Sequence, residues 1–435
     1  MSGSWHKRLL RLITVPIFLA MLTPLQALGG GLTMYEVGTP DTGYASAGYA
    51  ARANDPGTVL TNPAGITRLK GKQLLLGGHL LYGHAEFEPD SGTTVRGNEG
   101  GNAVGPLPGL NGFATWKVND DFAVGFGMFS NFGLGLWYDG NWVGRYYAKE
   151  AILMGLSFLP VAAYRITDKL SIGAGPNIML GYLKNTVAIN NADPALGDGE
   201  LHLRDTAWGV GANAGLLYEL SPSTRFGVTY TSPIKLDFSP STDFSGTGPG
   251  ITGLLAQRGL YSNHLNLGVT VPQAVMTSFY HDLNDRWAIL GNFGWQQWSQ
   301  FGKVDVSLAN TSNPTGLTTN LKYRDTWHGA LGAQYRIAPP WLITGGVAYD
   351  SSMMDDANRS PSLPLGWAWR FALGGQCALT KSVDLGVAYE YLYSGNPAID
   401  KSGQLPVALG GRGDLSGSYP NMSIQFFSAN VTWKF

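Results

Sequence analysis

Apolar and polar residues alternate with a period of two along much of the chain, which is the pattern of β-strands with two different faces. Between residues 225 and 238, apolar side chains occupy most even positions, and polar residues or glycine occupy the odd ones except Pro233. Similar alternation runs through 323–337, 367–380 and 383–393. A soluble sandwich would also alternate, but its polar face would carry more Lys and Glu and its strands would be shorter. The pattern favours a membrane barrel, with one row facing lipid and the other a lumen.

Long and short connections alternate between these segments. Short turn signals lie at 119–121, 167–169, 221–223, 284–286, 338–340 and 380–382. Longer polar or Gly/Pro-rich stretches lie at 85–109, 134–150, 191–204, 239–262, 304–321, 352–366 and 395–420. An up-and-down barrel has short periplasmic turns and long external loops. Seven long loops and six short turns therefore predict an all-β fold of 14 antiparallel strands.

Both ends of the chain indicate export to the outer membrane. Basic residues precede the apolar run 12–22, and Leu25-Gln26-Ala27 offers a cleavage site, so residues 1–27 are predicted to be a signal peptide. A membrane-anchoring helix is the alternative, but this run is shorter than the ~20 residues that span a bilayer. The last strand ends on Phe435. This terminal aromatic residue resembles the signal read by the outer-membrane assembly machinery, which we expect as a partner.

Composition supports a barrel in the outer membrane of a Gram-negative bacterium. Charged residues make up 14% of the chain, and 60 of the 435 residues are glycine, about twice its usual ~7% share. The net charge of −1 gives no basic face for a nucleic-acid partner. The single cysteine, Cys377, excludes an intrachain disulfide and a thiolate metal site. We expect no metal and no cofactor.

Residues 28–71 differ from the predicted barrel, 72–435. They are small and turn-rich, with Gly/Ala-rich residues 43–48, Asn54-Asp55-Pro56-Gly57 and Asn62-Pro63-Ala64. A segment of this size cannot hold a core by itself. Because a 14-stranded barrel has a wide lumen, we expect this segment to fill it as a hatch.

Motifs distributed over nearly the whole mature chain resemble the FadL/TodX family of outer-membrane transporters for long-chain fatty acids and aromatic hydrocarbons. They are Asn62-Pro63-Ala64, 130–134, 208–220, 229–230, 235–238, 287–288, 298–301, Asp325, 330–332, 350–352 and 358–361. Asn-Pro-Ala alone is weak, but the set in this order is specific. The resemblance implies a 14-stranded barrel with an N-terminal hatch, and a kinked third strand that opens the wall sideways for release of substrate into the membrane.

The matching kink segment is 129–134, with Ser130, Asn131, Phe132 and Gly133 at its centre. Asn and Gly are poor strand formers, which supports a defect there. An ordinary strand end that enters a loop is the alternative.

Two departures from the family pattern bear on the substrate. The third external loop, near 191–204, is short, so the fourth loop is left to form an external capture patch with Ile251, Leu254, Leu255 and Leu260. In the fifth strand, Tyr182 replaces a basic residue of the family's lumen site, while Lys184 is kept. Both departures leave smaller hydrocarbons open as substrates.

Three arginines are predicted by strand parity to project into the lumen: Arg324, Arg336 and Arg370. A guanidinium group there would bind a substrate carboxylate through charge-assisted hydrogen bonds. Alternatively, these side chains pair with Glu219, Glu390 or Asp384 and brace the barrel. Arg324 is the leading candidate, because the family has a cation at the matching position before Asp325.

Passive uptake of hydrophobic small molecules by a monomer is the function that these observations favour. Long-chain fatty acids are the leading substrate, with aromatic or other hydrocarbons as the alternative. Outer-membrane lipids and lipopolysaccharide are the expected surroundings. A lipase or protease barrel would need a nucleophile and a base that face each other, and the sequence contains no such motif. The hatch argues against a general porin.

Overall fold

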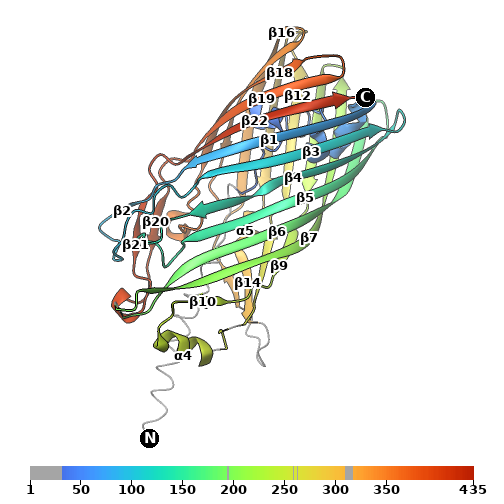
Figure 1. Cartoon of the computed structure of the whole chain (residues 1–435). Helices are drawn as coiled ribbons and strands as arrows, with labels where there is room; N and C mark the ends of the chain where they lie inside the picture. Colours follow the sequence, from blue (N-terminus) through green and yellow to red (C-terminus); the bar gives the residue numbers. More distant parts are fainter. Residues whose placement is uncertain (1–31, 194, 258, 262, 309–316) are drawn as a thin grey trace.

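The computed structural model describes residues 32–193, 195–257, 259–261, 263–308 and 317–435. Fourteen of its strands form a closed antiparallel barrel, because neighbours pair along the chain, β1 pairs with the last strand, β22, and β7 pairs with β8 (Figure 1). The barrel strands are β1 (Lys72–His84), β3 (Pro106–Lys117), β4 (Phe122–Trp137), β5 (Glu150–Arg165), β6 (Leu170–Asn190), β7 (Asp198–Ser221), β8 (Thr224–Thr231), β12 (Ala274–Asp282), β13 (Trp287–Gln296), β16 (Thr326–Ala338), β17 (Trp341–Asp350), β18 (Ala368–Ala378), β19 (Val383–Tyr393) and β22 (Ser423–Lys434). The predicted 14-stranded barrel is confirmed. The expected signal peptide lies outside the described residues.

Period-2 alternation sets the two faces of the wall. In β16, Leu331 is 63% exposed on the outside, whereas the side chains of His328 and Gln334 are buried inside. None of the helices among the described residues has the length and apolar character needed to cross a membrane.

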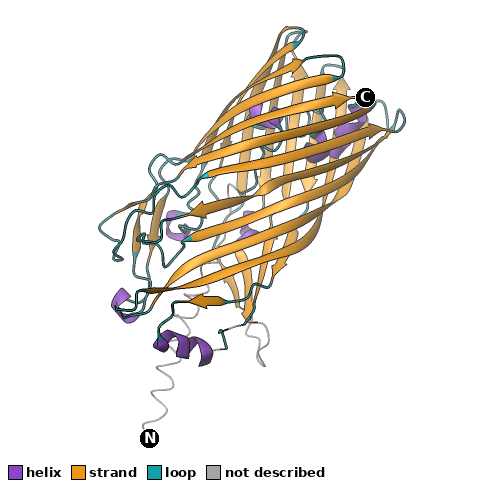
Figure 2. Ribbon diagram, viewed as in Figure 1, coloured by secondary structure: helices purple, strands orange, loops and turns teal. Residues whose placement is uncertain are grey.

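External loops carry further elements beyond the barrel (Figure 2). One small sheet contains β9 (Ile234–Phe238), β11 (Leu265–Val271), β14 (Lys303–Leu308) and β15 (Leu317–Asn320). Another contains β2 (Glu88–Pro89), β20 (Ala398–Lys401) and β21 (Leu415–Ser418), and β10 (Asp243–Ser245) pairs with the end of β7. The loop helices are α4 (Pro249–Gln257), α5 (Trp298–Phe301), η3 (Asp356–Asn358) and η4 (Val407–Leu409).

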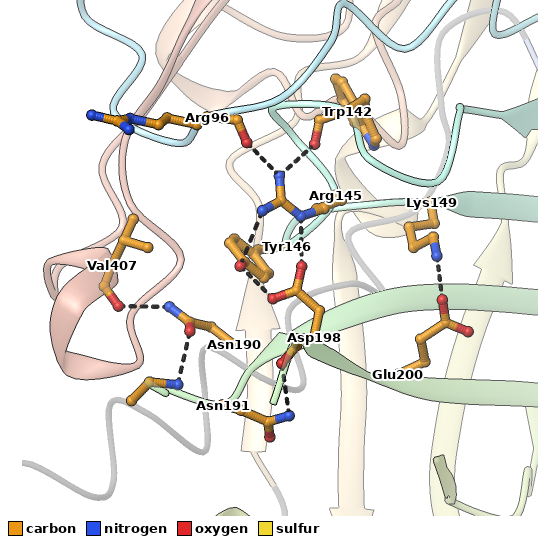
Figure 3. A network of polar contacts seen from close by, with 12 residues as sticks. Arg96, Trp142, Arg145, Tyr146, Lys149, Asn190, Asn191, Asp198, Glu200 and Val407 are labelled. Atoms are coloured by element: carbon orange, nitrogen blue, oxygen red, sulfur yellow. Dashed lines mark hydrogen bonds and ion pairs between the residues drawn. The ribbon is translucent and has the colours of Figure 1, made fainter. Parts of the chain in front are cut away.

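A polar network ties the external loops to one another (Figure 3). Arg145 donates to the backbone oxygen of Arg96 in one loop and to Asp198 at the start of β7. Asn190, at the end of β6, donates to the backbone oxygen of Val407 in the last long loop. These bonds hold four loop segments in one assembly at the external end.

Residues 32–71 form the hatch and lie within the barrel (Figure 1). Its helices are α2 (Thr39–Gly43), α3 (Thr58–Thr61) and η2 (Pro63–Arg68). Helix α2 packs against β18 and β19, and η2 packs against β5, β6 and β7 on another side of the lumen. The hatch thus contacts widely separated parts of the wall.

Wall glycines allow the hatch backbone to approach the strands closely. A β-carbon at Gly227 would lie 1.9 Å from the carbonyl oxygen of Ala50, and one at Gly346 would lie 1.8 Å from that of Tyr44. Any larger residue would force the hatch away from the wall at these points. Part of the glycine excess therefore reflects the docking of the hatch.

The alternation of 225–238 does not continue as one lipid-facing row. Strand β8 ends at Thr231, and beyond Pro233 the residues Ile234, Leu236 and Phe238 are buried instead of facing lipid. Proline cannot donate to a strand ladder, and the direction of the side chains changes where it interrupts the strand. Tyr323 is also buried and precedes β16, so its predicted place in a lipid-facing row was wrong.

Candidate functional site in the barrel lumen

A pocket lies between the hatch and the inner wall, with an empty volume of about 690 Å³ that is partly open to solvent. The hatch side contributes Thr33, Tyr35, Tyr49 and Leu60. The wall side contributes Asn131, Phe132, Asn177, Met179, Thr229, Thr231, Ile234, Val271, Pro272, Ala274, Val275, Met276, Trp295 and Gln296. Among the described residues, this lining contains no Asp, Glu, Lys or Arg. The pocket therefore suits an uncharged, largely apolar ligand.

Neutral polar groups interrupt the apolar lining. The side-chain oxygens of Asn131 and Asn177 are buried without a hydrogen-bond partner among the described residues. Gln296 donates to the Tyr35 hydroxyl at 2.7 Å. Burial raises the pKa of the Tyr35 and Tyr49 hydroxyls well above their ordinary range, so both stay neutral. These groups can hydrogen-bond a polar part of a ligand without supplying charge.

The wall next to this pocket is interrupted at strand β4. Phe129 pairs with Ser157 of β5, but Phe132 pairs with Gly155, so β4 carries one extra residue in a bulge. On its other side, β4 pairs with β3 only from Ala123 to Met128. The second half of β4 therefore has no ladder with β3, and no ladder hydrogen bonds close the wall between the two strands there.

The start of the hatch pairs with the bulge from inside. The amide of Met34 donates to the oxygen of Asn131 at 2.9 Å, and the amide of Gly133 donates to the oxygen of Leu32 at 2.9 Å. Thr33 and Phe132 form an isolated antiparallel bridge. The hatch segment 32–34 thus satisfies the backbone at the interruption and adjoins the pocket.

A buried ionic cluster joins the hatch to the far wall. The guanidinium of Arg370 pairs with Glu36 of the hatch, with Asp350 at 2.6 Å and with Glu390 at 3.2 Å. Tyr35, which lines the pocket, lies against Arg370 and against the ring of His328. One surface of the pocket is therefore fixed by charged groups that lie outside the pocket lining.

Comparisons with known proteins decide the family. The description "Outer membrane protein transport protein (OMPP1/FadL/TodX)" belongs to the family whose profile matches residues 20–435. The chain belongs to the OMPP1/FadL/TodX family. It is a β-barrel protein of the Gram-negative outer membrane.

Relatives and solved structures agree with this family. A long-chain fatty acid transport protein of Escherichia coli is 28% identical over 372 residues, covering 79% of this chain and 82% of the relative. Outer membrane protein P1 of Haemophilus influenzae is 29% identical over 385 residues, covering 78% and 82%. The crystal structure of a Pseudomonas aeruginosa FadL homologue superposes with a TM-score of 0.82 at 22% identity, covering 93% of this chain and 99% of that chain. The toluene transporter TbuX of Ralstonia pickettii has a TM-score of 0.66 at 19% identity, with the same coverage. These structures show the fold.

Asn62-Pro63-Ala64, the predicted hatch motif, lies at the hatch–wall contact. The side chain of Asn62 caps η2 by accepting from the amide of Ala64, and Pro63 occupies the first turn. The Asn62 amide donates to the backbone oxygens of Ala50 in the hatch and Leu216 in β7. This motif links two hatch segments to the wall, and it does not line the pocket.

The strand-parity argument for Arg324 was wrong. Strand β16 begins at Thr326, so Arg324 lies in irregular backbone before it, where alternation sets no direction. Its side chain is 56% exposed and pairs with the exposed Asp355 at 2.7 Å. Arg370 does face the lumen, but its partners are carboxylates, including the expected Glu390. Arg336 pairs with Asp282.

The expectation that Tyr182 and Lys184 face the lumen was also wrong. In β6 the buried inner positions are odd-numbered, and Tyr182 and Lys184 share the outward parity of the exposed Ile172. Lys184 pairs with Glu150 at 2.7 Å, and the guanidinium of Arg204 lies over the Tyr182 ring. Both residues belong to the outer surface of the barrel.

The apolar residues of the fourth loop do not form one exposed patch. Leu255 and Leu260 are buried, Ile251 packs partly against the core, and Leu254 is exposed. Leu260 donates its amide to the oxygen of Leu255, which fixes the end of α4. Most of this set stabilises the loop itself.

Ser46, His328 and Asp350 form a hydrogen-bonded series that the sequence did not indicate. Ser46 Oγ lies 2.8 Å from His328 Nε2, and His328 Nδ1 lies 2.7 Å from Asp350. The imidazole of His328 thus lies between the Ser46 hydroxyl and the Asp350 carboxyl group. Serine hydrolases use this order of groups. Here Ser46 and His328 are buried and neither lines the pocket, so the series joins hatch to wall.

No cluster of metal-ligating side chains occurs in the described part of the chain.

Proposed function

We propose that this protein carries hydrophobic small molecules passively across the outer membrane, with long-chain fatty acids as the leading substrate. A molecule binds in the lumen pocket and leaves sideways at the interrupted strand β4. The proposal rests on one observation, which is that the pocket adjoins the interrupted wall. Asn131 and Phe132 belong both to the pocket lining and to the bulge in the wall. The similarity to a long-chain fatty acid transport protein of Escherichia coli supports fatty acids.

Aromatic or other hydrocarbons are the second candidate. No described residue of the pocket lining carries a charged side chain, which favours them, since hydrocarbons need no counter-ion. Aliphatic burial contributes about 0.8 kcal/mol per CH₂ for either class. The pocket can therefore select ligands of either class by their apolar volume.

Transport is proposed in preference to catalysis. The Ser46–His328–Asp350 series could suggest a hydrolase, but a reacting ester needs access to the hydroxyl, and Ser46 is buried. A fluorophosphonate probe that labelled Ser46 would favour an enzyme over this proposal.

The outer surface provides two further proposals about partners. Lys184 and Arg204 are register partners on the outward face of β6 and β7, just beyond the exposed Trp208. We propose that they face lipopolysaccharide phosphates, and that the β22 strand with Phe435 is read by the assembly machinery. The barrel is proposed to act as a monomer.

A disulfide at the bulge tests release. Thr33→Cys with Phe132→Cys, in a Cys377→Ser background, would fasten hatch residue 33 to β4 at their existing bridge. Pocket binding is measured by photolabelling of Met179 and Met276 with a diazirine-bearing fatty acid, and transport by uptake of radiolabelled fatty acid into cells. We expect the oxidised protein to keep its label and lose uptake, and reductant to restore uptake.

The matched control is Val347→Cys with Phe371→Cys, which joins two paired outward residues of β17 and β18. Its oxidation should leave uptake unchanged. Full uptake by the oxidised bulge variant would exclude release at β4, and lack of pocket label in the reduced protein would exclude the binding site.

A further inference from the structure

The barrel wall has a second interruption, between β7 and the β8–β12 hairpin. The β7–β8 ladder ends at Asn213 and Thr231, followed by one bond from the Ser232 amide to the Ala212 oxygen. Pairing on this side of β7 resumes only at His202, which pairs with β10. Within the described residues, no strand pairs with 203–211 of β7 on this side.

Backbone groups of β7 are left facing this gap. Ala212 directs its amide and carbonyl toward β8, and alternate residues of a strand direct theirs the same way. Arg204, Thr206, Trp208 and Val210 therefore present backbone groups to a side without a strand partner. Trp208 and Val210 are 61% and 64% exposed on the outside. An open strand edge at the depth of lipid is costly unless it is covered or has a function.

Prolines keep the gap from closing. Pro233 follows β8 and Pro272 precedes β12, so both strands of the hairpin are interrupted at the same level. Beyond this level β9 lies behind β7: a β-carbon at Gly209 would lie 2.5 Å from Ile234 Cγ2, and one at Gly181 would lie 2.8 Å from Leu236 Cδ1. The wall here is an overlap of β7 over β9, held by side-chain packing without a ladder.

Ile234 occupies the centre of this overlap. Its side chain is buried, lies against Gly209 and Gly211 of β7, and also lines the lumen pocket. Thr231, Val271 and Pro272 line the same side of the pocket. One isoleucine therefore separates the pocket from an unpaired edge of the barrel wall.

We propose that this overlap, which we call the β7 seam, is a second lateral gate, through which hydrophobic molecules dissolved in the outer leaflet enter the pocket. Ile234 is the gate residue. The seam lies beside the outward Trp208 and Val210 of β7, whereas the bulge lies in β4, three strands away in the sheet. The inference rests on the proposed function, because it adds an entrance to the same pocket. Molecules that partition into lipid would reach the site without first crossing the external loops.

A disulfide across the seam tests the gate. Gly209→Cys with Ile234→Cys, in the Cys377→Ser background, places the two side chains in contact across the overlap, where the new β-carbon at position 209 also lies 2.5 Å from the Lys235 carbonyl oxygen. The purified protein in liposomes is given a diazirine-bearing fatty acid either dissolved in the bilayer or in water on a cyclodextrin carrier. The rate of photolabelling of Met179 and Met276 reports arrival in the pocket. For the bilayer route, we expect oxidation to slow labelling by about tenfold or more, because a locked gate cannot open, and reductant to restore it.

Two controls keep the outcome interpretable. Leu216→Cys with Val228→Cys joins outward partners within the intact β7–β8 ladder and should not affect either route. If the seam disulfide disturbs folding, Ile234→Ala provides the test: it should speed labelling by the bilayer route. Leu267→Ala, a buried change in β11 outside the pocket lining and away from the β7 glycines, should not.

The outcomes separate the gate from the proposed function. Bilayer labelling that is equally fast with the disulfide formed, or unchanged in Ile234→Ala, would overturn the gate while water-delivered ligand still labels the pocket. Absence of labelling by both routes in the unmodified protein would instead overturn the pocket as the transport site.

Discussion

Arg370 of β18 forms a buried ion pair with Glu36 of the hatch, and both side chains are almost fully enclosed. The same guanidinium bonds Asp350 and Glu390 on neighbouring strands. Three carboxylates thus converge on one arginine, with His328 bonded to Asp350. Because a buried charge is unfavourable without its partner, this cluster fixes the hatch relative to the wall more strictly than apolar contacts would.

Arg370→Met should loosen the hatch. Removing one partner of a buried ion pair typically costs about 3–5 kcal/mol, and here it leaves three carboxylates in the lumen. We expect a lower unfolding temperature and a higher single-channel conductance in planar bilayers. Glu36→Gln in the same chain should recover part of the loss. Arg336→Ala is the control: its pair with Asp282 is half-exposed, and such pairs contribute roughly 0–1 kcal/mol. Equal effects of both arginine substitutions would contradict this role.

Glycine substitutions in the wall should displace the hatch without unfolding the barrel. Gly227→Ala and Gly346→Ala each place a methyl group against hatch backbone that cannot move aside locally. We expect proteolysis within the hatch to become faster, measured by mass spectrometry of the fragments. Gly375→Ala provides a matched change, since a β-carbon there meets nothing within 4 Å. If hatch cleavage also became faster in Gly375→Ala, the effect would come from strand glycines in general and not from their contact with the hatch.

Arg324→Ala should leave fatty acid binding unchanged to within about twofold, since exposed ion pairs contribute little and Arg324 does not line the pocket. Asn177→Leu, which changes the pocket wall, should alter fatty acid binding measurably. Competition against the photolabelling ligand gives both affinities. A loss of about tenfold or more in Arg324→Ala, the size of a charge-assisted contact, would restore the head-group role of this residue.

The barrel and its topology followed from the sequence because alternation and turn composition are local properties. The predicted turn at 119–121 does join β3 to β4, and 167–169 joins β5 to β6. The prediction of side-chain direction from alternation was wrong where a regular strand was assumed. Arg324 lies before its strand, and Ile234 lies beyond Pro233. That proline, with Pro272, was a usable signal of an interrupted wall.

The contacts within the lumen could not be predicted in this way. Ser46 and His328 are 282 positions apart in the chain and meet only because the hatch folds into the closed barrel. For Tyr182 and Lys184, the face of β6 depends on its register with β5 and β7, which the isolated strand does not specify. The register shift between Phe129 and Phe132 lies within the predicted kink segment 129–134, where Asn131 and Gly133 were the local signal, but its size is a property of two strands.

The neutral lining of the pocket predicts how the head group of a ligand affects binding. A carboxylate that enters a site without a cation loses hydration without compensation. A protonated acid can instead donate one hydrogen bond to the unpaired side-chain oxygen of Asn177, and an ester carries no charge to desolvate. We expect a long-chain fatty acid methyl ester to bind at least as tightly as the ionised acid at pH 8.

Binding of the acid should strengthen as the pH falls toward the pKa of a carboxylic acid, about 4–5, because the neutral form becomes available, while binding of the ester should not change. Competition photolabelling at several pH values measures both. Asn177→Leu should weaken binding of the protonated acid by roughly 0.5–1.5 kcal/mol, the contribution of one hydrogen bond, and leave the ester and a pure hydrocarbon unaffected. If the ionised acid bound about tenfold more tightly than its ester at pH 8, a difference of ~1.4 kcal/mol, a cation would have to reach the head group, and selection by a neutral pocket would be wrong.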